Sequence, residues 1–260
     1  MITKEQVKIL SKKFKINEYV ITREYFQLLF LKELYSENFS QEVCFKGGTA
    51  IRIVYDGKRF SEDLDFTVNL KSSVFIKHLN TLFGKLERKY PVSFKERKTI
   101  TGKTYLMSAR LPDFKEKIFI RLDFSLRNDV VLPITQTIIN RGYPIIFNSF
   151  INCLSKDEIF AEKIRAFLNR DKYRDLYDLW MLLELGAKVD LNQINQKLKL
   201  YHETFEPKAF AKRLDSIEKI KFIQDLRPLV PIDQRDKLDQ LLIYIIQYLK
   251  SAFYPLPTIR

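Results

Sequence analysis

The chain has 260 residues, 46% of them hydrophobic, which is enough apolar material to bury a core in two modest domains. Its 45 Lys and Arg residues exceed its 32 Asp and Glu residues, and the formal net charge of +13 favours a polyanionic partner such as RNA, DNA or a nucleotide. The sequence contains no signal peptide and no apolar run near the roughly 20 residues of a membrane helix, so we expect a cytoplasmic protein with no membrane partner. Two isolated cysteines, Cys44 and Cys153, argue against a disulfide scaffold and fit a reducing compartment.

The first quarter of the chain combines helical periodicity with short apolar runs. Thr3 and Asn17 are suited to cap two helices, and the Asp56–Gly57 pair is suited to end a shorter one. The predicted elements are helices over 4–14, 18–37 and 49–55 and strands over 42–45 and 64–68. A short helix between two strands is therefore expected, with a Gly-Gly pair where the first strand meets that helix.

The middle of the chain predicts the rest of a sheet, and the last third predicts helices. The predicted elements up to residue 154 are a helix over 72–90, strand-like runs over 92–96, 104–111 and 117–126, and a strand-like stretch over 140–154 that contains turns. The predicted helices beyond them cover 159–170, after a Ser155–Glu158 capping box, and 173–185, 191–200, 207–220 and 233–253. We predict an α/β (α+β) fold in which a domain with a mixed sheet, residues 1–150, is followed by a helical bundle, residues 151–260.

Acidic residues occupy matching positions in the predicted strands. Side chains alternate along a strand, so Asp63 and Asp65 project from one face while their apolar neighbours point into the core. Two carboxylates held this close repel each other unless a cation lies between them, and oxygen ligands of this kind suit Mg²⁺ or Mn²⁺. Asp123 has the same apolar neighbours. Together the three acids could hold two cations about 4 Å apart, an arrangement that serves phosphoryl transfer.

The Gly-Gly pair offers bare backbone near these acids. Gly47 and Gly48 lie where the predicted strand meets the short helix, so their amide groups can receive phosphate oxygens, and Thr49 adds a hydroxyl donor. The segment would hold a triphosphate at one end and the metal ions at the other.

The order of these features resembles the nucleotidyltransferase superfamily of the DNA polymerase β type. That superfamily has a G-[GS] turn, then D-h-[DE]-h about ten or more residues later, and then h-[DE]-h. Gly47 to Thr49 match the turn, with threonine where serine is more common, Asp63 and Asp65 match the pair, and Asp123 matches the third acid. The resemblance implies a polymerase β-like domain in which the pair holds Mg²⁺ on the triphosphate. Asp123 would complete a second metal site and help to deprotonate the acceptor hydroxyl.

A second segment, "AEKIRAFLNRDKYRDLYDLW" over 161–180, narrows the resemblance. Together with "KGGTAIR" and "RFSEDLDF" it looks like the AbiEii/AbiGii group of abortive-infection nucleotidyltransferase toxins from type IV toxin-antitoxin systems. The residues that match that group here are Lys163, Arg170, Arg174, Asp175 and Asp178. Covering 45–180, the resemblance implies transfer from a nucleoside triphosphate to an acceptor, and some members are similar to transfer-RNA nucleotidyltransferases. We therefore expect an RNA acceptor, transfer RNA in particular, and a cognate antitoxin.

Lys163 and Arg170 are seven residues apart on a predicted helix, so they share a face and can meet phosphates there. We expect Lys163 to neutralise charge on the leaving pyrophosphate, and Arg170 and Arg174 to contact the nucleotide. Asp175 and Asp178 would orient these cations or position the acceptor. The alternative is that the segment carries only solvated helix charge with local pairing.

Two other functions are compatible with the sequence. One is nucleotide transfer to a protein or a small molecule, and the other is a catalytically inactive nucleic-acid-binding module that keeps the fold. Arg52, Lys58 and Arg59 lie between the glycines and the acids and would contact phosphate or the acceptor, or else face solvent. The aromatic residues, including 21 Phe, are expected in the core, with no stacking platform for single-stranded bases.

Overall fold

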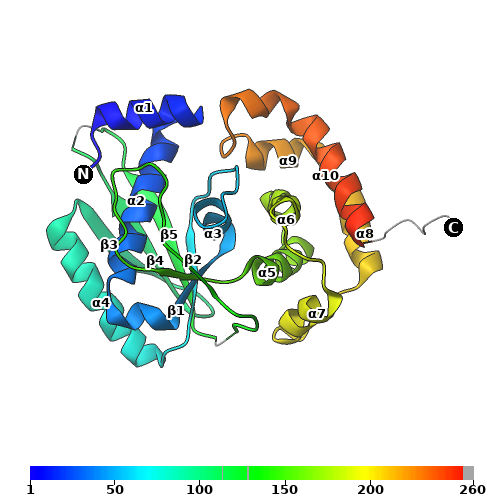
Figure 1. Ribbon diagram of the computed structural model, residues 1–260, viewed down its shortest axis with the longest axis horizontal. Helices are drawn as coiled ribbons and strands as arrows, with labels where there is room; N and C mark the ends of the chain where they lie inside the picture. Colours follow the sequence, from blue (N-terminus) through cyan, green and yellow to red (C-terminus); the bar gives the residue numbers. More distant parts are fainter. Residues whose placement is uncertain (113, 128, 254–260) are drawn as a thin grey trace. The chain divides into compact units, whose positions relative to one another are not determined.

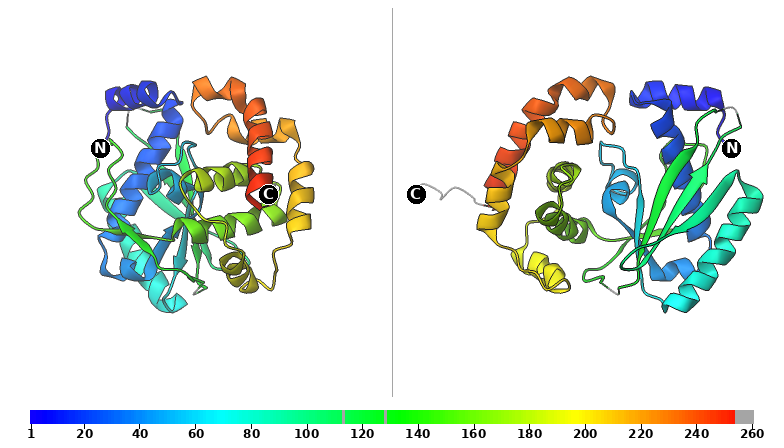
Figure 2. Two further views of the ribbon diagram at one scale, coloured as in Figure 1. Left: turned by 45° about the vertical axis from the view of Figure 1, so that its right-hand side comes forward. Right: turned by 180° about the vertical axis from the view of Figure 1, so that it is seen from behind.

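The computed structural model describes residues 1–112, 114–127 and 129–253. The chain folds into two compact units (Figures 1 and 2). The first unit comprises Met1–Asp56 and Phe60–Leu154, and the second comprises Gly57–Arg59 and the chain from Ser155 onward. A short segment between two elements of the first unit therefore belongs to the second.

The first unit is built on a seven-stranded mixed sheet with the strand order β3-β4-β5-β2-β1-β7-β6. The strands are β1 (Val43–Lys46), β2 (Leu64–Val68), β3 (Val92–Arg97), β4 (Lys103–Ala109), β5 (Ile118–Ser125), β6 (Thr135–Thr137) and β7 (Ile151–Cys153). The pairs β2–β5 and β1–β7 are parallel, and the other neighbours are antiparallel. The central strand, β2, is thus buried between an antiparallel and a parallel neighbour.

Four helices accompany this sheet. They are α1 (Lys4–Phe14), α2 (Glu18–Tyr35), α3 (Gly47–Ile53) and α4 (Ser72–Lys89), and a 3₁₀ turn covers Asn38–Glu42. α2 and α4 pack on the same face of the sheet, where Phe30 of α2 lies 6.2 Å from Phe66, and Phe83 of α4 stacks on Phe94 at 3.9 Å between ring centroids (Figure 1). Among the described residues, no helix combines the length and apolar character needed to cross a membrane.

Most elements predicted for this unit are confirmed. Thr3 and Asn17 cap α1 and α2 through their side chains, and β2 has the predicted bounds 64–68. In the strand-like, turn-containing stretch predicted over 140–154, only Ile151–Cys153 forms a strand, and the chain before it turns at Gly142, whose φ is +71°. β6 is not predicted, since its residues "TQT" show no apolar alternation.

The second unit is helical beyond residue 155. Its helices are α5 (Lys156–Asn169), α6 (Arg174–Glu184), α7 (Leu191–Lys199), α8 (Pro207–Asp215), α9 (Lys219–Leu226) and α10 (Leu238–Phe253), and a 3₁₀ turn covers Ile232–Lys237. Phe210 lies at its centre, 4.6 Å from Phe253 and 5.6 Å from Phe167 between ring centroids. The predicted α/β fold with a mixed sheet and following helices is confirmed.

Two helix predictions in this unit need correction. The single helix expected over 207–220 is two helices, α8 and α9. α8 ends at Asp215, and the hydroxyl of the next residue, Ser216, donates to the carbonyl of Arg213 at 2.9 Å and so competes with the backbone bonds that would continue the helix. The helix expected over 233–253 starts later, at Leu238, since the preceding residues form the 3₁₀ turn.

Candidate active site

Gly47 stands where β1 runs directly into α3. Its φ is +77°, a conformation that favours glycine. A Cβ atom at this position would overlap Oδ2 of Asp65 and lie 3.0 Å from its Cγ. Two features therefore require glycine at position 47: the positive φ of the turn and the close approach of the Asp65 carboxylate to the backbone.

Thr49 connects the same turn to the segment before β2. Its hydroxyl donates to the backbone carbonyl of Asp63, and only 1% of the residue is exposed. The hydroxyl that the sequence assigns to phosphate thus has a structural partner, which ties α3 to the start of β2. The phosphate contacts of Gly47, Gly48 and Thr49 stay predictions.

The parallel pairing of β2 with β5 sets Asp65 opposite Asp123 in register. The residues on either side of both aspartates in these strands are buried, so alternation places the two carboxylates together on the other face. Thr104 of β4 donates to Oδ1 of Asp123 at 2.6 Å and fixes that side chain. Asp63 lies one residue before β2, and the sheet therefore brings the three predicted acids to one region.

Arg121 lies among these acids and was not singled out by the sequence analysis. Its Nη2 donates to Oδ2 of Asp63 at 3.0 Å, and its Nε lies 2.7 Å from Oδ2 of Asp123. The side chain is 44% exposed, so solvent weakens both ion pairs. The available signal was its position two residues before Asp123, which puts both on one face of β5.

The donor set fits a divalent cation in its chemistry. Asp63, Asp65 and Asp123 offer carboxylate oxygens, which Mg²⁺ and Mn²⁺ prefer, and the cradle at Gly47 keeps the Asp65 carboxylate close to the backbone. As their side chains stand, no group of three His, Cys, Asp or Glu residues in the described part of the chain could hold a metal ion. The Arg121 guanidinium bonds two of the three acids, so a metal ion has to compete with it.

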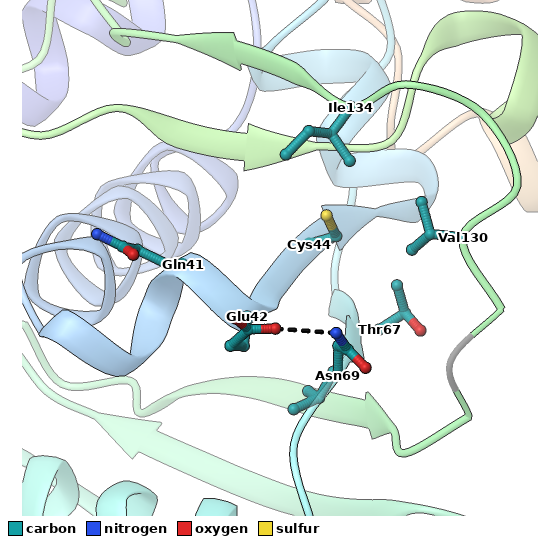
Figure 3. Close-up of a pocket in the computed structure, with 8 residues that line it drawn as sticks. Gln41, Glu42, Cys44, Thr67, Asn69, Val130 and Ile134 are labelled. Carbon is teal, nitrogen blue, oxygen red and sulfur yellow. Dashed lines mark hydrogen bonds between the residues drawn. The ribbon is translucent and has the colours of Figure 1, made fainter.

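A hollow of about 180 Å³ lies elsewhere on the first unit. Figure 3 shows Cys44 and Thr67 in its lining, with Glu42 accepting a 3.0 Å hydrogen bond from Asn69. It is at the end of β1 and β2 where Val43 pairs with Val68, whereas Asp65 lies near the opposite end of β2. This hollow is therefore separate from the acids and holds none of the predicted site residues.

A buried ionic cluster occupies the second unit. Lys163 of α5 places its Nζ 2.7 Å from Oδ1 of Asp175 and 2.7 Å from Oδ2 of Asp178, both on α6. Arg59 forks onto Asp178 at 2.6 and 2.5 Å, and Arg170 forks onto Asp175 at 2.7 and 2.9 Å. The two aspartates thus pair with Lys163, Arg170 and Arg59, and their roles in orienting these cations or positioning the acceptor stay predictions.

Charge pairing in this cluster outweighs the cost of burial. Burial alone would raise the pKa of the Asp178 carboxyl, but Arg59 and Lys163 hold that pKa below its usual range. Burial would likewise lower the pKa of Lys163, but Asp175 and Asp178 raise it. Lys163 is therefore a protonated cation with both carboxylates ionised at neutral pH.

The other cations predicted near the nucleotide have varied surroundings. Arg52 does not face solvent, because it is 8% exposed and pairs with Glu24 at 2.8 Å. Lys58 is exposed, and Arg174 is partly exposed at the start of α6. The nucleotide contacts of Lys163, Arg170 and Arg174 stay predictions.

Comparisons with known proteins agree with this architecture. The family model described as "Nucleotidyl transferase AbiEii toxin, Type IV TA system" matches residues 29–243. The nucleotidyltransferase toxin MenT4 from Mycobacterium tuberculosis is similar over 98% of this chain and 95% of that chain, with 18% identity and a TM-score of 0.67. JHP933 from Helicobacter pylori is similar over 92% and 94%, with 19% identity and a TM-score of 0.52. No curated protein sequence matches the chain. At these identities the two structures establish a shared fold.

Gly47→Ala tests the close approach of the turn to Asp65. The new Cβ has to displace the carboxylate and adopt an unfavourable φ, so we expect a loss of about 1–3 kcal/mol in the free energy of unfolding. Gly84→Ala in α4 is the matched control, since nothing lies within 4 Å of its added Cβ, and it should stabilise the protein by up to about 1 kcal/mol. Thermal unfolding of both variants measures this, and equal melting temperatures would contradict the assignment.

Arg121→Gln tests the competition between the guanidinium and a metal ion. Removing a positive charge from the carboxylates should tighten Mn²⁺ binding about tenfold, which corresponds to about 1.4 kcal/mol in a largely solvated site. Arg110→Gln removes the same charge from a side chain that bonds only the Phe114 carbonyl among the contacts in the described residues, and should change the affinity little. Titration of the protein with Mn²⁺, without nucleotide, gives the comparison. Weaker binding by the Arg121 variant would overturn this role.

Asp178→Asn tests the buried cluster. Two buried cations lose a carboxylate, so we expect a loss of about 3–5 kcal/mol at pH 7. The folded-state pKa of Asp178 is depressed, so its contribution is present above the unfolded value of about 3.9 and is lost as the pH falls through the folded value. The difference between variant and parent should therefore shrink below about pH 4. Asp171→Asn, at a 77% exposed carboxylate, is the control and should lower the melting temperature much less than Asp178→Asn does. Melting curves against pH check both.

Proposed function

This chain belongs to the AbiEii family of nucleotidyltransferase toxins, and we propose that it moves a nucleoside monophosphate from a nucleoside triphosphate to an RNA acceptor, with transfer RNA as the acceptor class. The proposal includes a dependence on Mg²⁺ or Mn²⁺. It also includes a cognate antitoxin as the protein partner, as the family description indicates.

One observation carries the catalytic part of the proposal. Asp65 is in register with Asp123 on the neighbouring parallel strand, and its carboxylate rests against the bare backbone of Gly47. A triphosphate needs acidic groups for its metal ions and an unhindered backbone for its phosphate oxygens. Both features meet here at one strand, which supports a nucleotide site rather than an isolated acidic patch.

The residues of the first unit have separable roles in this proposal. Asp63, Asp65 and Asp123 would hold the metal ions, which when bound neutralise the triphosphate and stabilise the attacking and leaving oxygens. Asp123, oriented by Thr104, accepts the proton of the acceptor hydroxyl. The hydroxyl oxygen then forms a bond to the α-phosphorus as the bond from that phosphorus to pyrophosphate breaks. Arg121, once displaced from the acids, presents its donors to phosphate oxygens.

The acceptor class rests on charge. The net charge of +13 supports a polyanionic acceptor over a small neutral one.

In the second unit, Lys163 would contact the leaving pyrophosphate, and its two carboxylate partners would hold the ammonium group in place. Arg170 and Arg174 would contact the same nucleotide.

Substitution of the acids tests the reaction. With Mg²⁺, labelled nucleoside triphosphates and total RNA, Asp65→Asn and Asp123→Asn should each lower the rate of label transfer at least about a thousandfold, because several kcal/mol of charge stabilisation is lost. Glu96→Gln is the control, since this exposed carboxylate pairs with Lys103 at 2.6 Å and lies away from the acids. Label that resists nuclease but not protease would indicate a protein acceptor instead. An absence of label in RNA with all four nucleotides would contradict the proposal.

A further inference from the structure

The face of β3, β4 and β5 that carries Asp123 is open to solvent. α2 and α4 cover the opposite face, where Phe94, Tyr105 and Phe124 point. On the open face Phe119 of β5 is 47% exposed. We define this open face by Lys95, Arg97, Leu106 and Phe119.

Strand register aligns the open face with the acids. Lys95 of β3 pairs with Leu106 of β4, and Leu106 pairs with Arg121 of β5. One row along, Arg97 pairs with Thr104, and Thr104 pairs with Asp123, which is itself opposite Asp65. Because neighbouring strands are about 4.8 Å apart, Lys95 and Arg97 start about 10 Å from the β5 side chains.

The chemistry of the open face suits a nucleic-acid strand. Residues 92–121 contain eight Lys or Arg and three Asp or Glu, so this part of the sheet is basic. Lys95 and Arg97 are exposed and can meet phosphates, and Phe119 offers a ring on which an unstacked base can lie. An A-form duplex hides its base faces inside the stack, so a ring on an open sheet favours a single strand.

We propose that this open face binds the single-stranded end of the acceptor RNA and leads its terminal hydroxyl to Asp123. The proposal rests on the proposed function, because it names where that reaction's acceptor lies. Arg97, about 10 Å from Asp123 across β4, contacts a phosphate near the end, and Phe119, four residues or about 13 Å from Asp123 along β5, stacks on a base further along, with Lys95 on another phosphate.

Under this proposal Phe119 supplies a stacking ring, whereas the sequence analysis expects none. Alternation alone places Phe119 on the same side of β5 as Arg121 and Asp123, but the sequence does not say which side the helices cover. The structure answers that question, since Ile118 and Ile120 are buried and Phe119 is not.

Direct binding tests the proposal without the reaction. Fluorescence anisotropy of the full chain with a labelled single-stranded RNA of ~10 nucleotides, without nucleoside triphosphate, measures affinity. Phe119→Ala should weaken binding about 5- to 150-fold, and Phe119→Trp should retain it because stacking is kept. Lys95→Gln with Arg97→Gln should lower the slope of log affinity against log salt by about 0.7 for each lost phosphate contact.

Matched variants control for non-specific effects. Phe150→Ala removes a 60% exposed ring outside this face, and Lys103→Gln removes a cation that points to the other side of β4 and pairs with Glu96. Neither should reproduce the losses. Unchanged affinity for Phe119→Ala, or equal weakening with a blunt RNA duplex, would overturn the proposal. If Phe119→Ala binds as the parent does while the parent still labels RNA, the open face is refuted and the proposed function stands. If RNA is never labelled but the open-face variants bind RNA more weakly than the parent, the proposed function is refuted and the open face stands as an RNA-binding surface.

Discussion

The parallel register of β2 and β5 is the constraint on which the acidic site depends. Phe66 and Phe124, each one residue beyond a paired aspartate, stack inside the core at 4.9 Å between ring centroids. Because side chains alternate, a slip of one residue would bring these rings to the surface and bury the carboxylates. The apolar core therefore enforces the acidic pair, and the cost of holding two like charges together is met by packing on the other face of the sheet.

In both units, neighbouring carboxylates that would repel each other are paired with basic side chains, but the carboxylates of the first unit are more exposed than those of the second. Arg121 bonds its two acids in a position that solvent reaches, so a stronger cation can replace it at modest cost. Lys163, Arg59 and Arg170 surround two carboxylates that are at most 1% exposed, and removing one member leaves a buried charge. The first arrangement suits exchange of ligands, whereas the second suits a fixed scaffold.

Local sequence patterns predicted the features that depend on neighbouring residues, such as helix caps and strand bounds. They missed the contacts between residues that are far apart in the sequence. The caps at Thr3 and Asn17 and the bounds of β2 follow from spacing within a few residues. The ion pair of Arg59 with Asp178 spans 119 positions, and no short-range pattern predicts it. Arg121 was visible by alternation on β5, but its contact with Asp63 requires knowing that β5 pairs with β2. The short polar strand β6 carries no apolar signal at all.

Because the segment Gly57–Arg59 belongs to the second unit, no single cut in the sequence separates the two units. The chain leaves the sheet unit after Asp56, returns at Phe60 and leaves again after Leu154. A fragment that ends at Leu154 would keep the Arg59 guanidinium and discard its carboxylate partner, and the complementary fragment would keep Asp178 without its arginine. Cutting the chain between Leu154 and Ser155 thus separates the two members of a buried ion pair, so neither fragment retains the complete cluster.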